Sequence, residues 1–441
     1  MKADFRGARV WHIRKETSVS GLQVIQPNQE PKKGFRLDQE LHEELTQPTH
    51  GRKPLTPKGE PLALPEPPFP RHPELLERKM TDAEFHRFNR GRAIKAWAVP
   101  YVQSRWYRKQ LRPIVGYLFT EYKCNLDCHY CWAYNNTHKG MTEDTARRSI
   151  DWMEEIGCRV LAIMGGEPLI RWPFVHKVTD YAAQKGFFVY LATNGSLMRP
   201  KVIDRLGDAG IAVINLAIDS VEDRPELPKA FMPYKENFEY MVKMQRNYGF
   251  ASFININITR INLDDVRELT EIGHRYNIAT DYHINESPMM EQEHFKHHEG
   301  NSTFITPDDY EKIDELIDWL MEKHDEGYKM ANPRDQLANM KNMMRGKVEP
   351  WSCRAGQNTL IIREDGTLAP CFPMYGATHD WGHVESDKFD LVQLDEMKET
   401  CNTKCFSTLN SIVGHCYDNT RIIKWMAKQA KNRFRGVTGS M

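Results

Sequence analysis

The chain has 441 residues, enough to bury a large core and to form more than one domain. Its 60 basic and 60 acidic residues cancel, so the whole chain has no net field that would attract nucleic acid or an anionic membrane. No apolar run is long enough to span a bilayer, and residues 1–16 lack the apolar centre of a signal peptide. We therefore expect a cytoplasmic protein with no nucleic-acid partner.

Residues 1–112 are expected to form an irregular arm followed by a helix. Eight prolines fall between residues 47 and 72, a density that opposes both helix and central strand. The segment 93–112 is basic and aromatic and has a more helical pattern. We favour a helix that packs on the body of the protein, and peripheral contact with a membrane is the alternative.

Residues 113–290 alternate between strand and helix patterns. This alternation favours a parallel sheet with right-handed crossovers, as an incomplete barrel or a doubly wound sheet. In either form the loops after the strands carry the site. Strands are expected at 114–120, 159–164, 187–192, 213–218, 252–259 and 280–284, and helices at 142–156, 172–185, 201–209, 235–248 and 263–276.

Three further regions follow this core. Residues 291–350 are expected to be a helical connector, with helices at 306–323 and 334–346. Residues 351–418 form a cysteine-bearing module that opens with a hairpin at 361–368, where Asp365-Gly366 supplies the turn. Residues 419–441 contain a final amphipathic helix.

A loop of three cysteines directly after the first strand is the strongest chemical signal. Cys124, Cys128 and Cys131 have the spacing C-x3-C-x2-C. Thiolates suit zinc or iron–sulfur clusters, and a structural zinc site normally has four protein ligands. Three thiolates therefore indicate a cluster with one open iron. Cys158 stands apart, before a buried strand, and is expected to be a small core residue.

Polar and glycine-rich turns follow the next strands. A Gly-Gly-Glu-Pro turn allows close backbone approach to a ligand, although such a turn is ordinary when it occurs alone. Polar side chains that face a barrel interior are costly unless they bind something, and a network of water is an equal alternative. The residues concerned are Gly165, Gly166, Glu167, Asn194, Asn215, Asp219, Asn255 and Asn257.

These motifs, in this order, resemble the radical S-adenosylmethionine (radical SAM) superfamily over about 113–286, including the aromatic Tyr130 before the third cysteine. The resemblance implies a partial (β/α)6 barrel. It also implies a 4Fe–4S cluster on Cys124, Cys128 and Cys131, with SAM bound to the open iron. The implied reaction is reductive cleavage of SAM to a 5′-deoxyadenosyl radical, which abstracts hydrogen from an unactivated C–H bond. The electron would come from a reductant such as flavodoxin or ferredoxin.

The same resemblance assigns the SAM-binding residues. Gly165, Gly166 and Glu167 would hold the amino group, and Tyr130 would lie near the adenine. Asn194 and Asp219 occupy the segments that contact ribose and methionine. Where many members have a serine two residues before that aspartate, this chain has Ala217. Asn215, Asn255 and Asn257 are candidates to supply the missing hydrogen bonds.

The C-terminal cysteines resemble the SPASM/twitch extensions of this superfamily, which bind auxiliary clusters. Five cysteines are present where the full SPASM form uses seven, so we expect one auxiliary 4Fe–4S cluster. Its expected ligands are Cys353, Cys371 and Cys416, and Cys401 and Cys405 compete for the fourth place. Zinc bound to four cysteines is the alternative.

Two classes of function fit the sequence. The first is a radical SAM enzyme whose substrate is a peptide, a small molecule or a lipid. The second is a non-catalytic iron–sulfur protein that carries electrons or senses redox state. His283, at the end of the sixth strand, could carry a proton, but we favour a structural role for it.

Overall fold

The computed structural model describes residues 63–66, 79–106, 111–131, 138–284, 301–347, 353–375, 379–386, 389–401 and 407. The strands of this part form one sheet in the order β6-β5-β4-β3-β2-β1-β7-β8, and β1 to β6 are parallel. The sheet does not close, which confirms the predicted partial barrel. The first six strands are β1 Val115–Glu121, β2 Val160–Gly165, β3 Phe188–Thr193, β4 Val213–Ala217, β5 Ala251–Ile258 and β6 Ala279–Ile284.

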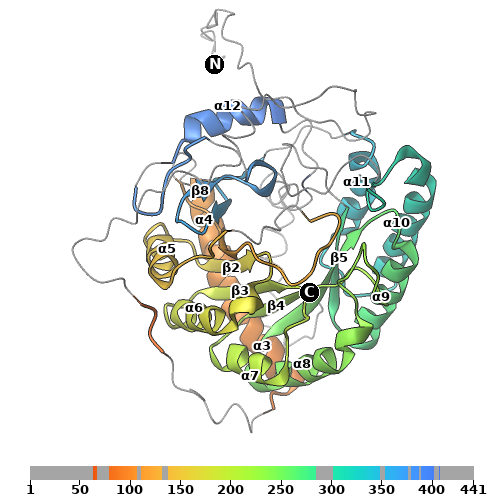
Figure 1. Cartoon of the computed structure of the whole chain (residues 1–441), viewed down its shortest axis with the longest axis horizontal. Coiled ribbons are helices and arrows are strands. Elements are labelled where there is room, and N and C mark those ends of the chain that lie inside the picture. The colour runs from red at the N-terminus through yellow and green to blue at the C-terminus, as the bar shows by residue number, and fades with distance from the viewer. Residues whose placement is uncertain are drawn as a thin grey trace, which may run out of the picture.

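Helices cover the outer face of this sheet (Figure 1). The alternation in β5 shows why: Ile254, Ile256 and Ile258 are fully buried on one face, and Asn255 and Asn257 lie on the other. The helices that bury the apolar face are α5 Glu143–Glu155, α6 Trp172–Gln184, α7 Pro200–Asp208, α8 Lys235–Tyr248 and α9 Leu263–Arg275. All five helices and all six strands lie within two residues of their predicted bounds. The connector contributes α10 Tyr310–Asp325 and α11 Arg334–Met343.

A long helical segment closes the amino end of the barrel. It consists of α3 Asp82–Ala93, a π-helical turn Ile94–Ala98 and α4 Val99–Trp106. It begins at a capping box in which Thr81 and Glu84 exchange hydrogen bonds. Ala96 and Tyr101 pack against the starts of the strands, in one apolar cluster with Val115, Val160 and Phe188. The described part of the basic aromatic segment, residues 93–106, therefore packs on the barrel through one face.

The C-terminal hairpin continues the barrel sheet. Strands β7 Thr359–Ile362 and β8 Leu368–Ala369 pair antiparallel, which confirms the hairpin predicted from Asp365-Gly366. Strand β7 also pairs parallel with β1, so the cysteine-bearing module shares a sheet with the core. Helix α12, Leu391–Cys401, follows this hairpin (Figure 1).

A short piece of the N-terminal arm lies on the barrel. Leu64 is buried, and its backbone N–H donates to Glu143 Oε2 at 2.9 Å. The rest of the proline-rich segment before residue 79 and the predicted helix within 419–441 lie outside the described residues.

Candidate functional site

The cysteine loop leaves the sheet at the carboxyl end of β1. Cys128 is buried, and Cys124 and Cys131 are half-buried. Burial raises the pKa of the Cys124 thiol to about 11 and that of Cys128 to about 12. A bound cation would reverse this preference for the thiol form. The three thiols influence one another electrostatically, which places them around one site.

The thiols do not meet at one point. Among the described residues, no group of three or more His, Cys, Asp or Glu side chains is arranged to hold a single metal ion. In a cubane cluster each thiolate binds a different iron, so the three sulfurs need not converge on one atom. A donor set of three thiols in one loop fits such a cluster.

The Gly-Gly-Glu turn after β2 packs directly against the start of the cysteine loop. Gly166 N–H donates to Glu121 O at 2.6 Å, and Glu167 N–H donates to Lys123 O at 2.8 Å. Gly165 has φ +156°, and a Cβ there would lie 2.2 Å from Glu121 O. Both glycines are therefore required by close backbone approach, which is the property expected from the sequence.

The side chain of Glu167 points into the protein. It is fully buried, and its carboxylate accepts hydrogen bonds from Thr193 Oγ1 at 2.8 Å, Asn194 N–H at 2.8 Å and Leu169 N–H at 2.9 Å. Burial raises the pKa of Glu167, and these hydrogen bonds act in the opposite direction. The carboxylate thus ties the end of β2 to the loop after β3.

Asn194 links the loop after β3 to the cysteine loop. Its Nδ2 donates to Asn125 Oδ1 at 3.1 Å and contacts Cys124 Sγ at 3.8 Å. Its Oδ1 accepts from Ser196 N–H at 3.0 Å, which fixes the orientation of the amide. The structure therefore brings Asn194 beside the first cysteine.

Asp219 lies at the centre of a buried network after β4. It is 1% exposed, and its Oδ1 accepts from the backbone N–H of Asn257 at 2.7 Å. Its Oδ2 accepts a hydrogen bond from the Tyr130 hydroxyl and lies 3.7 Å from Lys229 Nζ. Asp219 thus connects β4, β5 and the cysteine loop. Tyr130 lies beside Asp219, and burial followed by that negative charge raises its pKa.

Lys229 is a site residue that the sequence analysis missed. Its Nζ lies 5.0 Å from the centre of the Tyr130 ring and within electrostatic reach of all three thiols. Burial alone would lower the pKa of Lys229, but the negative charge of Asp219 and those of the three cysteines in their thiolate form raise it above its ordinary value. Lys229 lies in an irregular segment between β4 and α8, where no periodic pattern marks it.

Asn255 lies on the inner face of the barrel. In the parallel register it stands between Ala217 of β4 and Asp281 of β6. His283 forms a 3.3 Å contact from Nε2 to Asp281 Oδ2 on the same face. The segment 285–300 that follows β6 lies outside the described residues.

Two of the C-terminal cysteines lie together. Cys353 and Cys371 pack in one small cluster with Ala355, Met374 and Met397 of α12. Helix α12 ends at Cys401, whose side chain is not described, and Cys405 and Cys416 lie outside the described residues. By contrast, Cys158 is fully buried and contacts backbone carbonyls within the core, as expected.

The hairpin module also reaches into the barrel. The hydroxyls of Tyr122, two residues before Cys124, and Tyr375, after Cys371, share a hydrogen bond. Both rings pack with Phe119 and with the partly buried Cys131 in one cluster. The two cysteine regions are therefore in direct contact through aromatic side chains.

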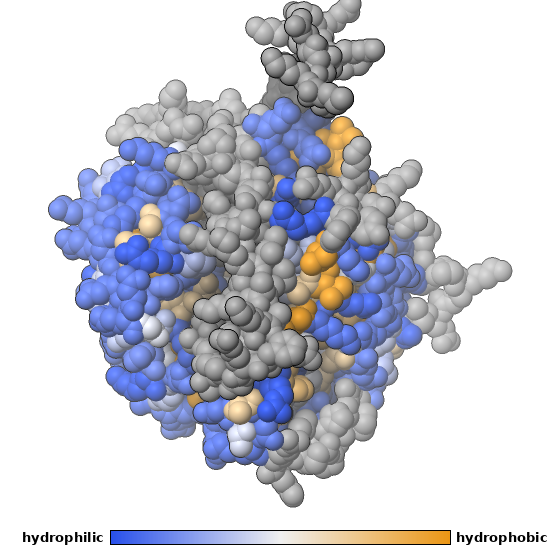
Figure 2. Space-filling view, turned by 180° about the vertical axis from the view of Figure 1, so that it is seen from behind, coloured by the Kyte–Doolittle hydropathy of each residue, from blue (hydrophilic) through white to orange (hydrophobic). Residues whose placement is uncertain are grey.

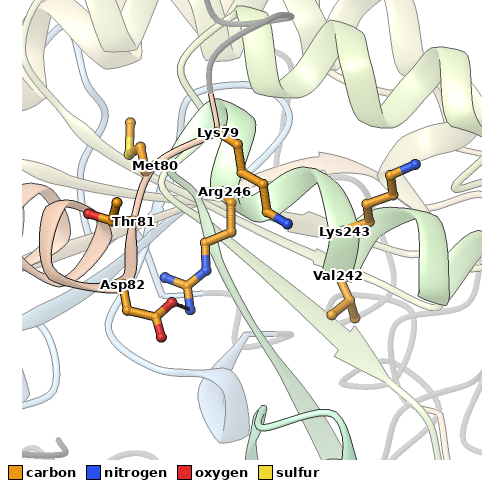
Figure 3. Close-up of a pocket in the computed structure, with 7 residues that line it drawn as sticks. All are labelled: Lys79, Met80, Thr81, Asp82, Val242, Lys243 and Arg246. Atoms are coloured by element: carbon orange, nitrogen blue, oxygen red, sulfur yellow. Dashed lines mark ion pairs between the residues drawn. The ribbon is translucent and has the colours of Figure 1, made fainter.

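A surface pocket lies between the start of α3 and helix α8 (Figure 3). It is held together by an ion pair of 2.7 Å between Arg246 and Asp82. Its other lining residues are Lys79, Met80, Thr81, Val242 and Lys243. None of the residues assigned to the site from sequence lines it. In the part of the chain that the structure describes, we find no helix with the length and apolar character to cross a bilayer.

The fold is a partial barrel. Its cysteine loop, beside a glycine-rich turn, supplies ligands of the type that hold iron–sulfur clusters. Residues 120–272 match the model of the radical SAM superfamily. These residues therefore correspond to a radical SAM domain. Members bind a 4Fe–4S cluster and SAM and cleave SAM to a radical, so the cofactors expected from the sequence are confirmed for this domain.

Curated relatives match only part of the chain. An "AdoMet-dependent heme synthase" of Methanosarcina barkeri is 28% identical over 214 residues, which cover 46% of this chain and 56% of the relative. An "S-adenosylmethionine-dependent nucleotide dehydratase" of Selenomonas ruminantium is 26% identical and covers 36% of this chain and 60% of the relative. The chain thus spans about half the length of such relatives. Both are named enzymes.

A solved structure shares the fold. SuiB of Streptococcus suis, bound to S-adenosylmethionine, superposes with a TM-score of 0.51 over 66% of this chain and 68% of that chain. The sequence identity is 15%, so this likeness concerns the fold alone.

Proposed function

We propose that this chain is a radical SAM enzyme that cleaves SAM reductively and abstracts hydrogen from an unactivated C–H bond of its substrate. The observation that carries the proposal is the packing of the Gly165-Gly166 turn against the cysteine loop. This contact holds the turn against residues 121–123, directly before Cys124, at the carboxyl end of a parallel barrel. Such strand ends are where parallel barrels carry their active sites.

Each site residue has a proposed role that follows from its contacts. Cys124, Cys128 and Cys131 hold the cluster, which when bound supplies the electron that cleaves SAM. The backbone at Gly165 and Gly166 holds the amino group of SAM, because the Glu167 carboxylate is occupied within the protein.

Other residues position the loops or meet the cofactor. Asn194 and Asp219 fix the cysteine loop against β3 and β5. Lys229 supplies a cation beside Tyr130, suited to a carboxylate, and Asn255 offers hydrogen bonds from the inner face. The electron donor is a low-potential reductant such as flavodoxin or ferredoxin.

Anaerobic reconstitution with iron and sulfide, followed by dithionite and SAM, tests the proposal. We expect the parent to form 5′-deoxyadenosine and Cys128→Ala to form none. Cys158→Ala is the matched control, because Cys158 is a core residue outside the loop, and it should retain the activity per folded molecule. SAM that remains intact with the parent would favour an electron carrier or redox sensor. Equal activity of Cys128→Ala and parent would refute the ligand assignment.

We also propose one auxiliary 4Fe–4S cluster in the C-terminal module. The packing of Cys353 and Cys371 beside the end of α12 supports this proposal, with Cys401 or Cys405 and Cys416 as the remaining ligands. Cys371→Ala should lower the iron bound per chain by about half and spare part of the SAM cleavage. Unchanged iron content would contradict the assignment.

A peripheral contact with an anionic bilayer is proposed for the segment from α3 to α4. Apolar side chains gather on the back face of the molecule (Figure 2), and Ile94, Trp97, Val99 and Val102 are exposed. The segment 82–106 holds five Lys and Arg against two Asp and Glu, which favours an anionic surface. A larger fraction of the protein should sediment with phosphatidylserine vesicles than with phosphatidylcholine vesicles. Val99→Ser should reduce the fraction that sediments with phosphatidylserine vesicles. Equal sedimentation of the parent with the two kinds of vesicle would contradict the proposed contact with an anionic bilayer.

A further inference from the structure

The inner face of the barrel is lined by polar and aromatic side chains below the cysteine loop. On β5 and β6 the inward residues Phe253, Asn255 and Asp281 are half-buried, whereas their outward neighbours Ile254 and Tyr282 are fully buried. Below them, Ala96 of the π-helical turn and Tyr101 of α4 close the floor. The lumen is thus closed at its amino end and reachable at the end that carries the cysteines.

Two buried acceptors in this lumen have no partner in the described part of the chain. Asn215 is 6% exposed; its Nδ2 donates to the Tyr190 hydroxyl, and its Oδ1 has no partner. Asp281 Oδ2 contacts His283 Nε2 at 3.3 Å, and Asp281 Oδ1 is buried without a partner. A buried acceptor that lacks a donor costs free energy, so both atoms are suited to accept hydrogen bonds from a ligand.

Aromatic rings form the walls around these acceptors. The ring centres of Tyr190 and Phe253 lie 5.8 Å apart, and Tyr117 meets Phe372 edge to face at 5.0 Å. Burial, together with the negative charge of Asp281, raises the pKa of Tyr117 and of Tyr190, so both phenols stay neutral. Aromatic faces beside a carboxylate favour a cation, and none of the ion pairs of the described residues joins Asp281 to Lys or Arg.

The positions of the two acceptors limit the size of the ligand group. Asn215 lies on β4 and Asp281 on β6, with β5 between them. Strands two apart are separated by about 10 Å at the backbone, and Asp281 is level with Ala217, about 7 Å further along the strands than Asn215. The two backbone positions are therefore about 12 Å apart, and both side chains reach inward from there. The remaining gap suits one small group with several N–H donors.

We propose that this lumen binds a protonated nitrogen group of the substrate, an ammonium or guanidinium, with Asp281 and Asn215 as acceptors and Tyr117, Tyr190 and Phe253 as walls. This inference rests on the proposed function: binding of the nitrogen group in the lumen would hold the rest of the substrate below the cysteine loop. It narrows the substrate to molecules that carry a basic nitrogen at the end that enters the barrel.

Ligand-observed NMR on the anaerobically purified full chain tests this proposal with n-butylammonium, 1-butanol and butyrate as probes. We expect the ammonium to bind at least about tenfold more tightly than the alcohol, and butyrate not to bind. Asp281→Asn should weaken ammonium binding at least about tenfold. Asp318→Asn, which removes a carboxylate that is 62% exposed on α10, is the matched control and should bind as the parent does.

Equal binding of n-butylammonium and 1-butanol to the parent would overturn the proposal, as would equal ammonium binding by Asp281→Asn and parent. The comparison of probes uses the parent alone, so it stands even where the variant fails to fold. The result is also separate from the proposed reaction. Formation of 5′-deoxyadenosine without ammonium selectivity refutes the lumen site only, and ammonium selectivity without SAM cleavage refutes the reaction only.

Discussion

Replacing Gly166 by alanine should separate the turn after β2 from the cysteine loop. A Cβ at residue 166 would lie 2.5 Å from the carbonyl oxygens of Tyr122 and Lys123. Ordinary van der Waals contact begins at 3.4 Å, so the backbone would have to move by about 0.9 Å. Both contacts are to backbone atoms, which cannot rotate away as a side chain can.

The structure also sets the size of the effect. Overpacking of this kind costs about 1–3 kcal/mol. The movement weakens the hydrogen bonds from Gly166 N–H to Glu121 O at 2.6 Å and from Glu167 N–H to Lys123 O at 2.8 Å, each worth about 1 kcal/mol. We therefore expect Gly166→Ala to lower the free energy of unfolding by about 2–5 kcal/mol. It should also weaken SAM binding, because the loop that begins at Cys124 moves with Lys123.

Urea unfolding of the anaerobically purified proteins measures this effect. Gly91→Ala is the matched control: Gly91 lies inside α3, and a Cβ there meets nothing within 4 Å. This control should raise the free energy of unfolding by about 0.5–1 kcal/mol, because alanine favours helix. If Gly166→Ala has the stability and SAM affinity of the parent, the close approach is not a constraint and the reasoning fails.

Two further substitutions test the packing around the barrel. Burial raises the pKa of Glu364 to about 7 from an ordinary 4.5, so stability should fall by about 3 kcal/mol as pH rises from 4.5 through 7. Glu364→Gln should remove this dependence in denaturant titrations between about pH 4.5 and 8, and an unchanged slope would contradict the assignment. Arg92→Met should lower the free energy of unfolding by about 1–3 kcal/mol without changing 5′-deoxyadenosine formation per folded molecule. If Arg92→Met is as stable as the parent, the hydrogen bonds that Arg92 donates to the carbonyls of Ile211, Ala212 and Gly249 contribute nothing to the free energy of unfolding.

The barrel was predictable because its residues repeat with clear periods. Strand β5 alternates isoleucine with polar residues, and helix α8 ends at Gly249, which has φ +78°. Local patterns of this kind depend on burial of one face and need no distant contact. The cysteine loop and the Gly-Gly-Glu turn were predictable from spacing alone, since each is a short contiguous motif.

Contacts between distant segments were not predictable in this way. Nothing near Lys229 in the sequence indicates that its amine meets Tyr130, because the contact depends on how the segment after β4 folds back. The bond between Tyr122 and Tyr375 likewise joins two regions that the sequence presents as separate modules. The sequence also could not predict where the Glu167 side chain points, because a turn motif does not determine which hydrogen-bond donors surround that carboxylate.

The pairing of β1 with β7 has a consequence for how this protein folds. Val115 pairs with Val160 on one side and with Thr359, about 240 residues later, on the other. During synthesis this edge of β1 stays open until residues 359–362 have left the ribosome. Contacts so distant in sequence slow folding. Chaperone demand should therefore be highest just before the hairpin emerges, and a chain that ends after residue 350 should expose an unpaired strand edge.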